Sequence, residues 1–419
     1  MEMKKYKLGE IAEILSGGTP STKNEKYWNG EIPWLSVKDF GSVNKVVSTT
    51  EKTITNDGLK HCPSSILHKG DLILSARGTV GKVAIVDKDM AFNQSCFGLR
   101  ANKEITDSDF LFYWFLNNQQ IFKCAQQGNV FKSVTLDFFE KTYISLPPLP
   151  TQQKIAAVLS SLDKKIALNS RINARLEQMA KRLYEHYFVQ FDFPTADGKP
   201  YKTSGGKMVY SSELKREIPD GWEVLSVNDI SVSSRGVGYS VKDEKNKNDK
   251  DVVLILRGNN ISNNHIIYDD NTVYLDKSFI LPEQEIKKFD ILMTMSSGSK
   301  EHVGKSSMFL YNSPHSYGAF CNKFTPLKEC QFLLENYFHS DFFIKYIRQT
   351  CSGTGINNLT NKHFDEAKLA FPTEKILKDF NKKVQNIYSE IGNIQQESAR
   401  LTSLRDRLLP LLMNGQVSV

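Results

Sequence analysis

The sequence contains none of the common catalytic motifs. Two segments resemble such a motif, but each lacks a residue that the chemistry requires. There is no Walker A sequence, no G-x-S-x-G, no H-E-x-x-H and no G-x-G-x-x-G after a strand pattern. Leu146-Pro-Pro-Leu149 has the prolines of an adenine methyltransferase tetrapeptide, but neither its base-holding amide nor its stacking aromatic. Glu285-Ile-Lys287 resembles part of a nuclease carboxylate cluster, but no upstream Asp has a clear strand context. These residues point away from an enzyme.

The residue types that bind metals are also scattered. Six cysteines lie far apart without a C-x-x-C pair, namely Cys62, Cys96, Cys124, Cys321, Cys330 and Cys351. In a large chain without an export signal, this spacing predicts reduced thiols rather than disulfides or a zinc site. The eight histidines are dispersed, and lone ones such as His186 or His363 are typical of hydrogen-bonded structural residues. We expect no bound metal.

Length and composition describe an ordinary globular chain. A length of 419 residues corresponds to two or three domains, and 40% apolar, 24% charged and 11% aromatic residues exclude wholesale disorder and fibrous repeats. No apolar run approaches the length of a membrane span, and the amino terminus has no signal-peptide core. The sequence therefore predicts a cytoplasmic protein without a membrane partner.

The net charge of +7 is spread thinly along the chain. Residues 1–150 carry +2, residues 151–190 carry +4, residues 191–220 are neutral, residues 221–372 carry −1 and residues 373–419 carry +2. No block is a polybasic tail. Nucleic-acid binding is thus compatible with this chain only through locally placed cations on nearly neutral domains.

An internal repeat organises the sequence. Residues 128–147 align without a gap with residues 353–372, an offset of 225 positions. Upstream, the correspondence is weaker and needs short insertions, as between residues 67–86 and 286–309. Residues 193–207 between the halves are rich in Gly, Pro and Ser and predict a linker or long surface loop. The identical pairs of the aligned segment are Gly128/Gly353, Thr135/Thr360, Phe139/Phe364 and Pro147/Pro372.

Each aligned segment leads into a heptad pattern that predicts a long helix, over about 152–188 and about 374–413. Such helices need a packing partner, and the matching seams favour a coiled coil over two helices that each pack on their own domain. If the pair is antiparallel, the repeat becomes a pseudo-two-fold axis and the helices act as a spacer between two similar domains. The predicted seam residues are Ile155, Leu159, Leu162, Ile166, Asn169, Asn173, Leu176, Leu183, Phe380, Val384, Ile387, Ile391, Ile394, Ser398, Leu401 and Leu408.

Short motifs along the whole chain, in this order, resemble the specificity subunit of type I restriction–modification systems. Two stand in the first domain and one enters the first helix, and the others lie in the linker, at the start of the second domain and at the end of the chain. The motifs are Leu8-Gly-Glu-Ile-Ala-Glu-Ile-Leu-Ser-Gly-Gly-Thr-Pro20, Lys69-Gly-Asp-Leu-Ile-Leu-Ser-Ala-Arg-Gly78, Leu146-Pro-Pro-Leu-Pro-Thr-Gln-Gln-Lys-Ile-Ala156, Gly198-Lys-Pro-Tyr-Lys-Thr-Ser-Gly-Gly-Lys207, Ile218-Pro-Asp-Gly-Trp-Glu223 and Leu408-Leu-Pro-Leu-Leu-Met-Asn-Gly415.

The resemblance implies an α+β fold in which two globular α/β target recognition domains are separated by two long antiparallel helices that form a coiled coil. The segments would be target recognition domain 1 (1–150), helical region 1 (151–190), a linker (191–220), target recognition domain 2 (221–372) and helical region 2 (373–419). Such a chain is non-catalytic and binds no cofactor. Its partners would be double-stranded DNA, two modification subunits that use S-adenosylmethionine to methylate adenine, and restriction subunits that use ATP and Mg.

The resemblance does not fix the base-reading residues, so the candidates follow from chemistry. Arg pairs with guanine and Asn with adenine through two hydrogen bonds, whereas Lys more often holds phosphate. Polar and cationic side chains on glycine-rich loops are the ones a DNA backbone can approach. The candidates are Ser36, Lys38, Arg77, Thr79, Lys82, Asn129 and Lys132 in the first domain, and Arg235, Arg257, Asn259, Asn260, Ser299, Lys300, Lys305, Asn357 and Asn358 in the second.

The predicted function is therefore sequence-specific binding of an asymmetric bipartite DNA target, with one half-site for each domain and the gap set by the coiled coil. Two alternatives remain at this point. The chain could be the recognition component of another restriction–methylation assembly with a separate catalytic chain, or a coiled-coil scaffold that binds no DNA.

Overall fold

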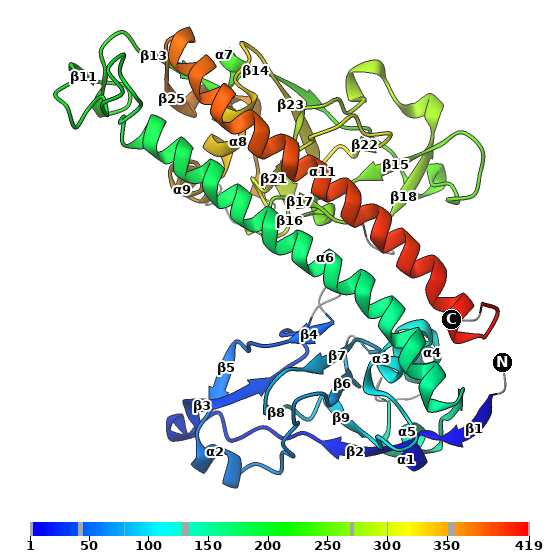
Figure 1. Ribbon diagram of the computed structural model, residues 1–419. Helices are drawn as coiled ribbons and strands as arrows, with labels where there is room; N and C mark the ends of the chain where they lie inside the picture. Colours follow the sequence, from blue (N-terminus) through cyan, green and yellow to red (C-terminus); the bar gives the residue numbers. More distant parts are fainter. Residues whose placement is uncertain are drawn as a thin grey trace. The chain divides into compact units, whose positions relative to one another are not determined.

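The structure is a computed structural model that describes residues 3–40, 45–78, 80–127, 134–268, 272–299, 301–350 and 357–417 (Figure 1). The chain divides into two compact units. The first unit comprises Met1–Arg171 and Gln396–Val419, and the second unit comprises Ile172–Gln395. Each unit therefore contains one globular body and one half of each long helix.

Strands of the first unit form two main sheets and one strand pair. A five-stranded sheet has the order β2-β9-β6-β7-β4, and a three-stranded sheet has the order β5-β3-β8. The pair β1-β10 is antiparallel. The strands are β1 (Lys4–Lys7), β2 (Ala12–Ser16), β3 (Trp28–Leu35), β4 (Val46–Val47), β5 (Lys52–Ile54), β6 (Leu72–Ser75), β7 (Val83–Val86), β8 (Ala91–Phe92), β9 (Cys96–Ala101) and β10 (Tyr143–Leu146).

Short helices and the long-helix ends complete the core of the first unit. The N-cap of α3 is Asp107, whose carboxylate accepts a hydrogen bond from the Phe110 N–H at 2.9 Å. Six consecutive α3 residues from Phe110 to Phe115 are buried, because this helix packs in the interior beside β7 and β9. The short helices are α1 (Leu8–Ile11), α2 (Asn56–Lys60), α3 (Ser108–Asn117), α4 (Gln119–Gln127) and α5 (Leu136–Lys141).

The second unit repeats this plan with its own strands. Its four-stranded sheet has the order β14-β23-β19-β21 and its three-stranded sheet the order β18-β15-β22. The pairs β11-β12, β13-β25, β16-β17 and β20-β24 complete the set. The strands are β11 (Met208–Ser211), β12 (Arg216–Pro219), β13 (Glu223–Ser226), β14 (Ser231–Arg235), β15 (Val252–Leu256), β16 (Ile261–Ser262), β17 (His265–Ile266), β18 (Val273–Asp276), β19 (Ile291–Thr294), β20 (Ser296–Ser297), β21 (Ser306–Met308), β22 (Ser316–Tyr317), β23 (Cys321–Pro326), β24 (Asn357–Asn358) and β25 (Lys368–Phe371).

The two units share their strand connections, which confirms the internal repeat over the region where the sequence correspondence is weak. In both, a central strand of the three-stranded sheet has one antiparallel and one parallel neighbour. Even single main-chain bonds recur. Cys96 and Cys321 each donate an N–H to the residue three positions before them, Asn93 and Gly318, at 3.2 and 2.9 Å. The helices of the second unit are α7 (Val227–Ile230), α8 (Gln331–Phe338), α9 (Asp341–Thr350) and α10 (Asn361–Glu366).

Two long helices run through both units, α6 (Leu149–Tyr184) and α11 (Glu374–Met413) (Figure 1). A π-helical turn, Glu185–Val189, extends α6 to about the predicted end. The helix starts at Leu149 rather than Gln152, because a proline in the first turn loses no intrahelical hydrogen bond and Pro150 is therefore tolerated there.

Contacts within each unit show that α6 and α11 are antiparallel, as expected. In the first unit, the Asp163 carboxylate pairs with Arg405 at 2.9 Å, and the Asn169 amide donates to Glu397 at 2.7 Å. In the second unit, the Tyr187 hydroxyl donates to Asp379 at 2.6 Å. The residue numbers of the α11 partners therefore fall as the residue numbers along the first helix and its extension rise.

All predicted seam residues are buried or half-buried. Asn169 is only 1% exposed, and its amide also donates to the Ser398 hydroxyl at 3.2 Å. Buried polar pairs of this kind fix the register of a coiled coil. Both helices also pack on the globular bodies, since Ile155 and Leu159 belong to the core of the first unit and Phe380 and Val384 to that of the second. The pair is therefore a coiled coil and a domain-packing element at once.

The segment predicted to be a linker or a long surface loop is a surface loop within the second unit, with most of residues 196–205 exposed. Phe193 is buried, and its ring stacks on Tyr201 at 4.6 Å and on Trp222 at 5.4 Å. The hairpin β11-β12 follows it. The three aromatic side chains supply a small core that holds the start of this loop. The compact units divide inside α6 and α11, so the segment boundaries proposed from sequence stay a prediction.

Candidate nucleic-acid interface

In the first unit, three chain segments that carry candidate residues meet at one edge. The Asn93 N–H donates to the Leu35 carbonyl at 3.0 Å, which joins the β8–β9 turn to the end of β3. Ala76 and Arg77 donate to the Ser95 carbonyl at 2.8 and 3.2 Å, which joins the same turn to the end of β6. Main-chain bonds thus bring the loops after β3 and β6 together.

A cleft of about 480 Å³ lies between these loops, and Ser36, Lys38 and Arg77 all line it. Lys38 and Arg77 are exposed. Lys52 and the acids Asp39 and Glu51 also line the cleft, so its side chains carry three positive and two negative charges. This composition suits an anionic backbone together with base edges.

Asp39 organises the polar groups of this cleft. Its carboxylate accepts from the Ser36 N–H at 2.7 Å, from the Ser36 hydroxyl at 2.8 Å and from the Glu51 N–H at 2.7 Å. Because the Ser36 hydrogen is already donated to Asp39, Ser36 is left as an acceptor toward a ligand.

The other candidates of the first unit stand apart from the cleft. Lys82 is half-buried, and its backbone pairs with Ser75 by two bonds of 2.9 Å, Ser75 N–H to the Lys82 carbonyl and Lys82 N–H to the Ser75 hydroxyl. Thr79, Asn129 and Lys132 lie outside the described residues.

The second unit gathers its candidates around an equivalent turn, between β22 and β23. The Gly318 N–H donates to the Leu256 carbonyl at 2.9 Å, next to Arg257. The Arg235 guanidinium donates to the Ala319 carbonyl at 3.3 Å. The turn therefore lies beside the ends of both β14 and β15, and it brings Arg235 close to the loop that carries Arg257 and the exposed Asn259.

Asn260 has a structural role in that loop. Its side chain is 1% exposed, and its amide oxygen accepts from the Arg257 N–H at 2.9 Å while its amide nitrogen donates to the Ile267 carbonyl at 2.9 Å. Both functions of the amide are engaged in holding the turn. The Asn260 side chain is therefore turned away from any ligand at this edge.

The remaining candidates follow β19 or lie on β24. Ser299 is exposed beside β20, and Asn358 is exposed on β24, which pairs with β20. The Lys305 amine lies 3.1 Å from the His302 ring, and Lys305 accepts from the Thr294 N–H in the same way as Lys82 does from Ser75. Lys300 and the Asn357 side chain lie outside the described residues.

Two residues at these edges were missed in the sequence. Ser95 lines the cleft of the first unit, and Phe320 is 69% exposed on the equivalent turn of the second. They lie 225 positions apart, which is the offset of the repeat. Extending that offset upstream of residue 128 could have paired them.

Comparisons with known proteins agree with this architecture. Residues 1–178 and 219–403 match the family model of the type I restriction modification DNA specificity domain. The chain belongs to this family. It is 28% identical to the type I restriction enzyme MjaIX specificity subunit of Methanocaldococcus jannaschii, over 99% of this chain and 93% of that protein. It is 25% identical to the HindI specificity subunit of Haemophilus influenzae, over 90% and 96%.

A solved structure in this family has the same fold. The type I restriction–modification S subunit from M. genitalium aligns with a TM-score of 0.53 over 98% of this chain and 96% of that one, at 14% identity. The resemblance seen in the sequence motifs is thus confirmed. As a specificity subunit the chain is non-catalytic, and the catalytic activities of the system lie in other subunits.

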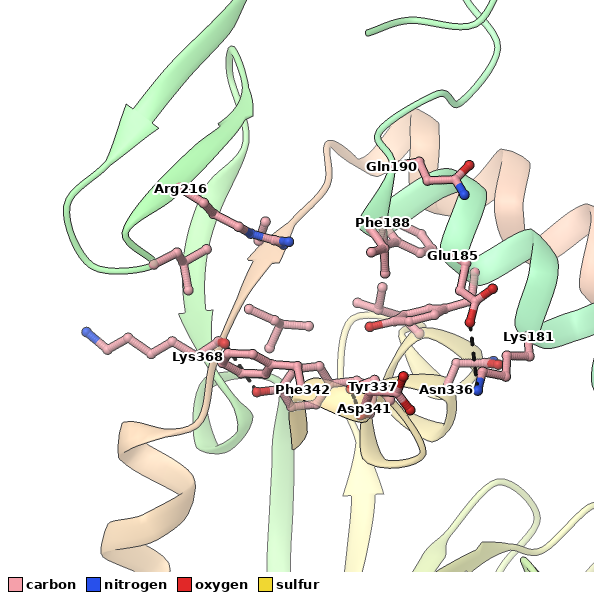
Figure 2. Close-up of a pocket in the computed structure, with 17 residues that line it drawn as sticks. Lys181, Glu185, Phe188, Gln190, Arg216, Asn336, Tyr337, Asp341, Phe342 and Lys368 are labelled. Carbon is pink, nitrogen blue, oxygen red and sulfur yellow. Dashed lines mark hydrogen bonds and ion pairs between the residues drawn. The ribbon is translucent and has the colours of Figure 1, made fainter. Parts of the chain in front are cut away.

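An apolar pocket of about 250 Å³ in the second unit of this specificity subunit lies apart from the candidate edges (Figure 2). Phe188, Tyr337 and Phe342 line it, and Lys181 and Glu185 lie 3.7 Å apart in its wall. The Arg216 guanidinium also lines it and lies 4.9 Å from the centre of the Phe191 ring. Its apolar wall suits a hydrophobic group rather than a phosphate.

The described part of the chain holds neither a metal-binding cluster nor a membrane-spanning helix. Among these residues no group of His, Cys, Asp and Glu is arranged to hold a metal ion. The five cysteines within the described ranges are free thiols, and burial raises the pKa of Cys96 and Cys321 to about 12. No described helix has both the length and the apolar character needed to cross a membrane.

Proposed function

We propose that this specificity subunit reads an asymmetric, bipartite sequence in double-stranded DNA. Each half-site would be read by the polar edge of one unit, which is the set of loops around Ser95 in the first unit and around Phe320 in the second. The observation that carries the proposal is the pair of equivalent turns with unlike side chains. The same main-chain bonds hold Ser95 next to Arg77 in one unit and Phe320 next to Ser296 in the other. Two similar scaffolds with different edges would read two different half-sites.

The proposed reading surface combines base contacts and phosphate contacts. Arg77, Arg235 and Asn259 have the guanidinium and amide groups that pair with base edges, whereas Lys38 and Lys305 suit phosphates. The antiparallel helices α6 and α11 would set the gap between the half-sites. We propose no cofactor for this chain and a cytoplasmic location.

The partners follow from the family. Two modification subunits that use S-adenosylmethionine would dock on this chain and methylate adenine, and restriction subunits that use ATP and Mg would translocate and cleave DNA. The weak net charge of the chain is consistent with strong DNA binding only within such an assembly.

Footprinting of the chain with its modification partners tests this function. We expect two protected segments with unlike sequences around an unprotected gap, and binding that weakens as salt rises. A single uninterrupted footprint would contradict the bipartite target. A coiled-coil scaffold without nucleic acid would show no salt-sensitive DNA binding. Methylation profiling of cells carrying the whole system would give the two half-sites.

The helical spacer has its own test. Adding four residues to α6 after Asn169, with a matching addition to α11 beside Ser398, lengthens the pair by about 6 Å. This length corresponds to about two base pairs, so the gap should widen while both half-sites stay the same. A change in the half-sites would contradict the modular arrangement.

A further inference from the structure

An exposed aromatic ring stands on the turn at the centre of the second unit's candidate edge. Phe320 lies between β22 and β23 and is 69% exposed. Burying a Phe side chain is worth roughly 1.5–3 kcal/mol, so leaving it in water forgoes that stabilisation. Its neighbour Cys321 is fully buried.

Main-chain hydrogen bonds fix the backbone of the turn that carries this ring. The Phe320 carbonyl accepts from the N–H groups of Met295 and Ser296 at 2.8 and 3.3 Å. On either side of it, Ala319 donates to the Val237 carbonyl at 2.9 Å and Cys321 donates to the Gly318 carbonyl at 2.9 Å. A ring on such a turn can contact a ligand without the entropy cost of ordering a loop.

Polar and cationic residues lie next to the turn that carries the ring. The Arg235 guanidinium bonds to the carbonyl of the preceding residue, Ala319. On the other side, Ser296 begins β20, which pairs with Asn358 on β24. A cation and hydrogen-bonding side chains thus flank an apolar ring, as in proteins that insert an apolar wedge while polar groups hold the grooves.

The first unit lacks such a ring at the equivalent place. Ser95 accepts there from Ala76 and Arg77 as Phe320 does from Met295 and Ser296. The first unit therefore presents an exposed cation at the end of β6 and a small side chain on the turn. Because the backbone is the same, the aromatic ring is not required by the scaffold.

We propose that Phe320 inserts between two adjacent base pairs of the second half-site and partly unstacks them. The inference rests on the proposed function and deepens it, because it assigns the second unit a mode of readout that the first lacks. A wedge reads the ease with which a base step opens rather than its hydrogen-bond pattern. Pyrimidine–purine steps open most easily, so the second half-site should contain one at the position of the ring.

Fluorescence of 2-aminopurine, placed at successive positions of the target DNA, tests the wedge in the complex with modification subunits. The modification subunits should raise the fluorescence at the adenines that they flip out for methylation in either half-site. Beyond those positions, wild-type protein should raise it at one step of the second half-site and at none of the first, since unstacking relieves quenching. Phe320→Ala should abolish the rise and weaken DNA binding about 10- to 100-fold, the range for loss of one stacked base. Phe320→Trp should retain both, and Phe320→Leu should keep part of the affinity.

Phe342→Ala is the matched control, since Phe342 is 59% exposed in the same unit but lies on α9, away from the turn. Its DNA affinity should equal that of wild type, and the melting temperatures of all four variants should stay near that of wild type, because both rings are exposed. Unchanged affinity and fluorescence with Phe320→Ala would overturn the wedge. If the wild-type complex bound no specific DNA, the proposed function itself would fail, which is a separate outcome.

Discussion

The two units use the same main-chain hydrogen bonds and different side chains at their polar edges. Where the first has Arg77 and Ser95, the second has Ser296 and Phe320. The turns depend on N–H and carbonyl groups, which every residue except proline supplies in full. Side chains on them are therefore free to differ without cost to the scaffold, as a pair of readers for unlike half-sites requires.

The interiors of the two units differ in another way, because a buried aspartate at the same place is paired with a different cation in each. Asp71 and Asp290 accept equivalent N–H bonds, from His68 at 2.8 Å and from Lys287 at 2.7 Å. Each also pairs with a cation on the neighbouring strand, at 2.8 Å with Arg100 in the first unit and at 3.3 Å with Lys323 in the second. The two cations come from different positions of their strands.

Substitution of these aspartates should lower the free energy of unfolding, and this should be the largest of the expected effects. The decrease should differ between the two units. Asp290 and Lys323 are 3% and 7% exposed, so Asp290→Ala leaves a buried amine without its carboxylate and should lower the free energy of unfolding by about 3–5 kcal/mol. Asp71→Ala should cost only about 1–3 kcal/mol, because Arg100 is 34% exposed and can turn to water. Urea denaturation measures both. Equal losses of unfolding free energy would show that the different burial of Lys323 and Arg100 does not affect the cost of removing their aspartates.

A substitution at the polar edge of one unit should change sequence preference in only one half-site of the DNA. Arg77→Ala should weaken binding by about 1–3 kcal/mol and relax sequence preference in the first half-site only, because its guanidinium lines the first unit's cleft. Competition binding with targets altered in one half at a time checks this. Lys38→Ala is the comparison, since loss of a phosphate contact should weaken all sequences alike and reduce the salt dependence. Relaxed preference in the second half-site with Arg77→Ala would contradict the assignment.

The sequence alone predicted the architecture better than the edges. The 225-residue offset predicted the repeat, and the heptads predicted the helix pair, because both are spacing patterns that can be seen in the sequence itself. The same pattern could not show that Asn260 turns inward, since a buried amide and an exposed one have the same sequence. Phe320 was missed because an aromatic residue beside a strand pattern is usually a core residue, and only its exposure of 69% in the structure shows that the ring faces outward.

A third difference lies where each globular body meets the helix pair. In the first unit the Tyr113 hydroxyl donates to Asp163 on α6. In the second unit the Asn336 amide donates to the Tyr388 hydroxyl on α11 at 2.8 Å, beside Glu335 and His339. Burial raises the pKa of Glu335 to about 8 and lowers that of His339 to about 4. Burial thus favours the neutral form of both groups across their 3.5 Å approach.

This cluster should give the second unit a pH dependence, the smallest of the expected effects. The pKa of Glu335 is higher in the folded than in the unfolded chain, so its protonated form stabilises the fold at low pH, and this contribution is lost as the pH rises through about 8. His339 acts in the opposite sense, since its contribution is present above its ordinary pKa and is lost as the pH falls toward 4.

Glu335→Gln removes the first of these two dependences. The variant should melt near wild type at pH 5 and a few degrees higher at pH 9, because at pH 9 the wild-type carboxylate is charged although it is buried and one of its oxygens has no hydrogen-bond partner. Melting temperatures measured from pH 5 to pH 9 give the comparison. Glu390→Gln on an exposed face of α11 should show no such divergence. Parallel curves for wild type and Glu335→Gln would mean that Glu335 is ionised in the fold throughout this range.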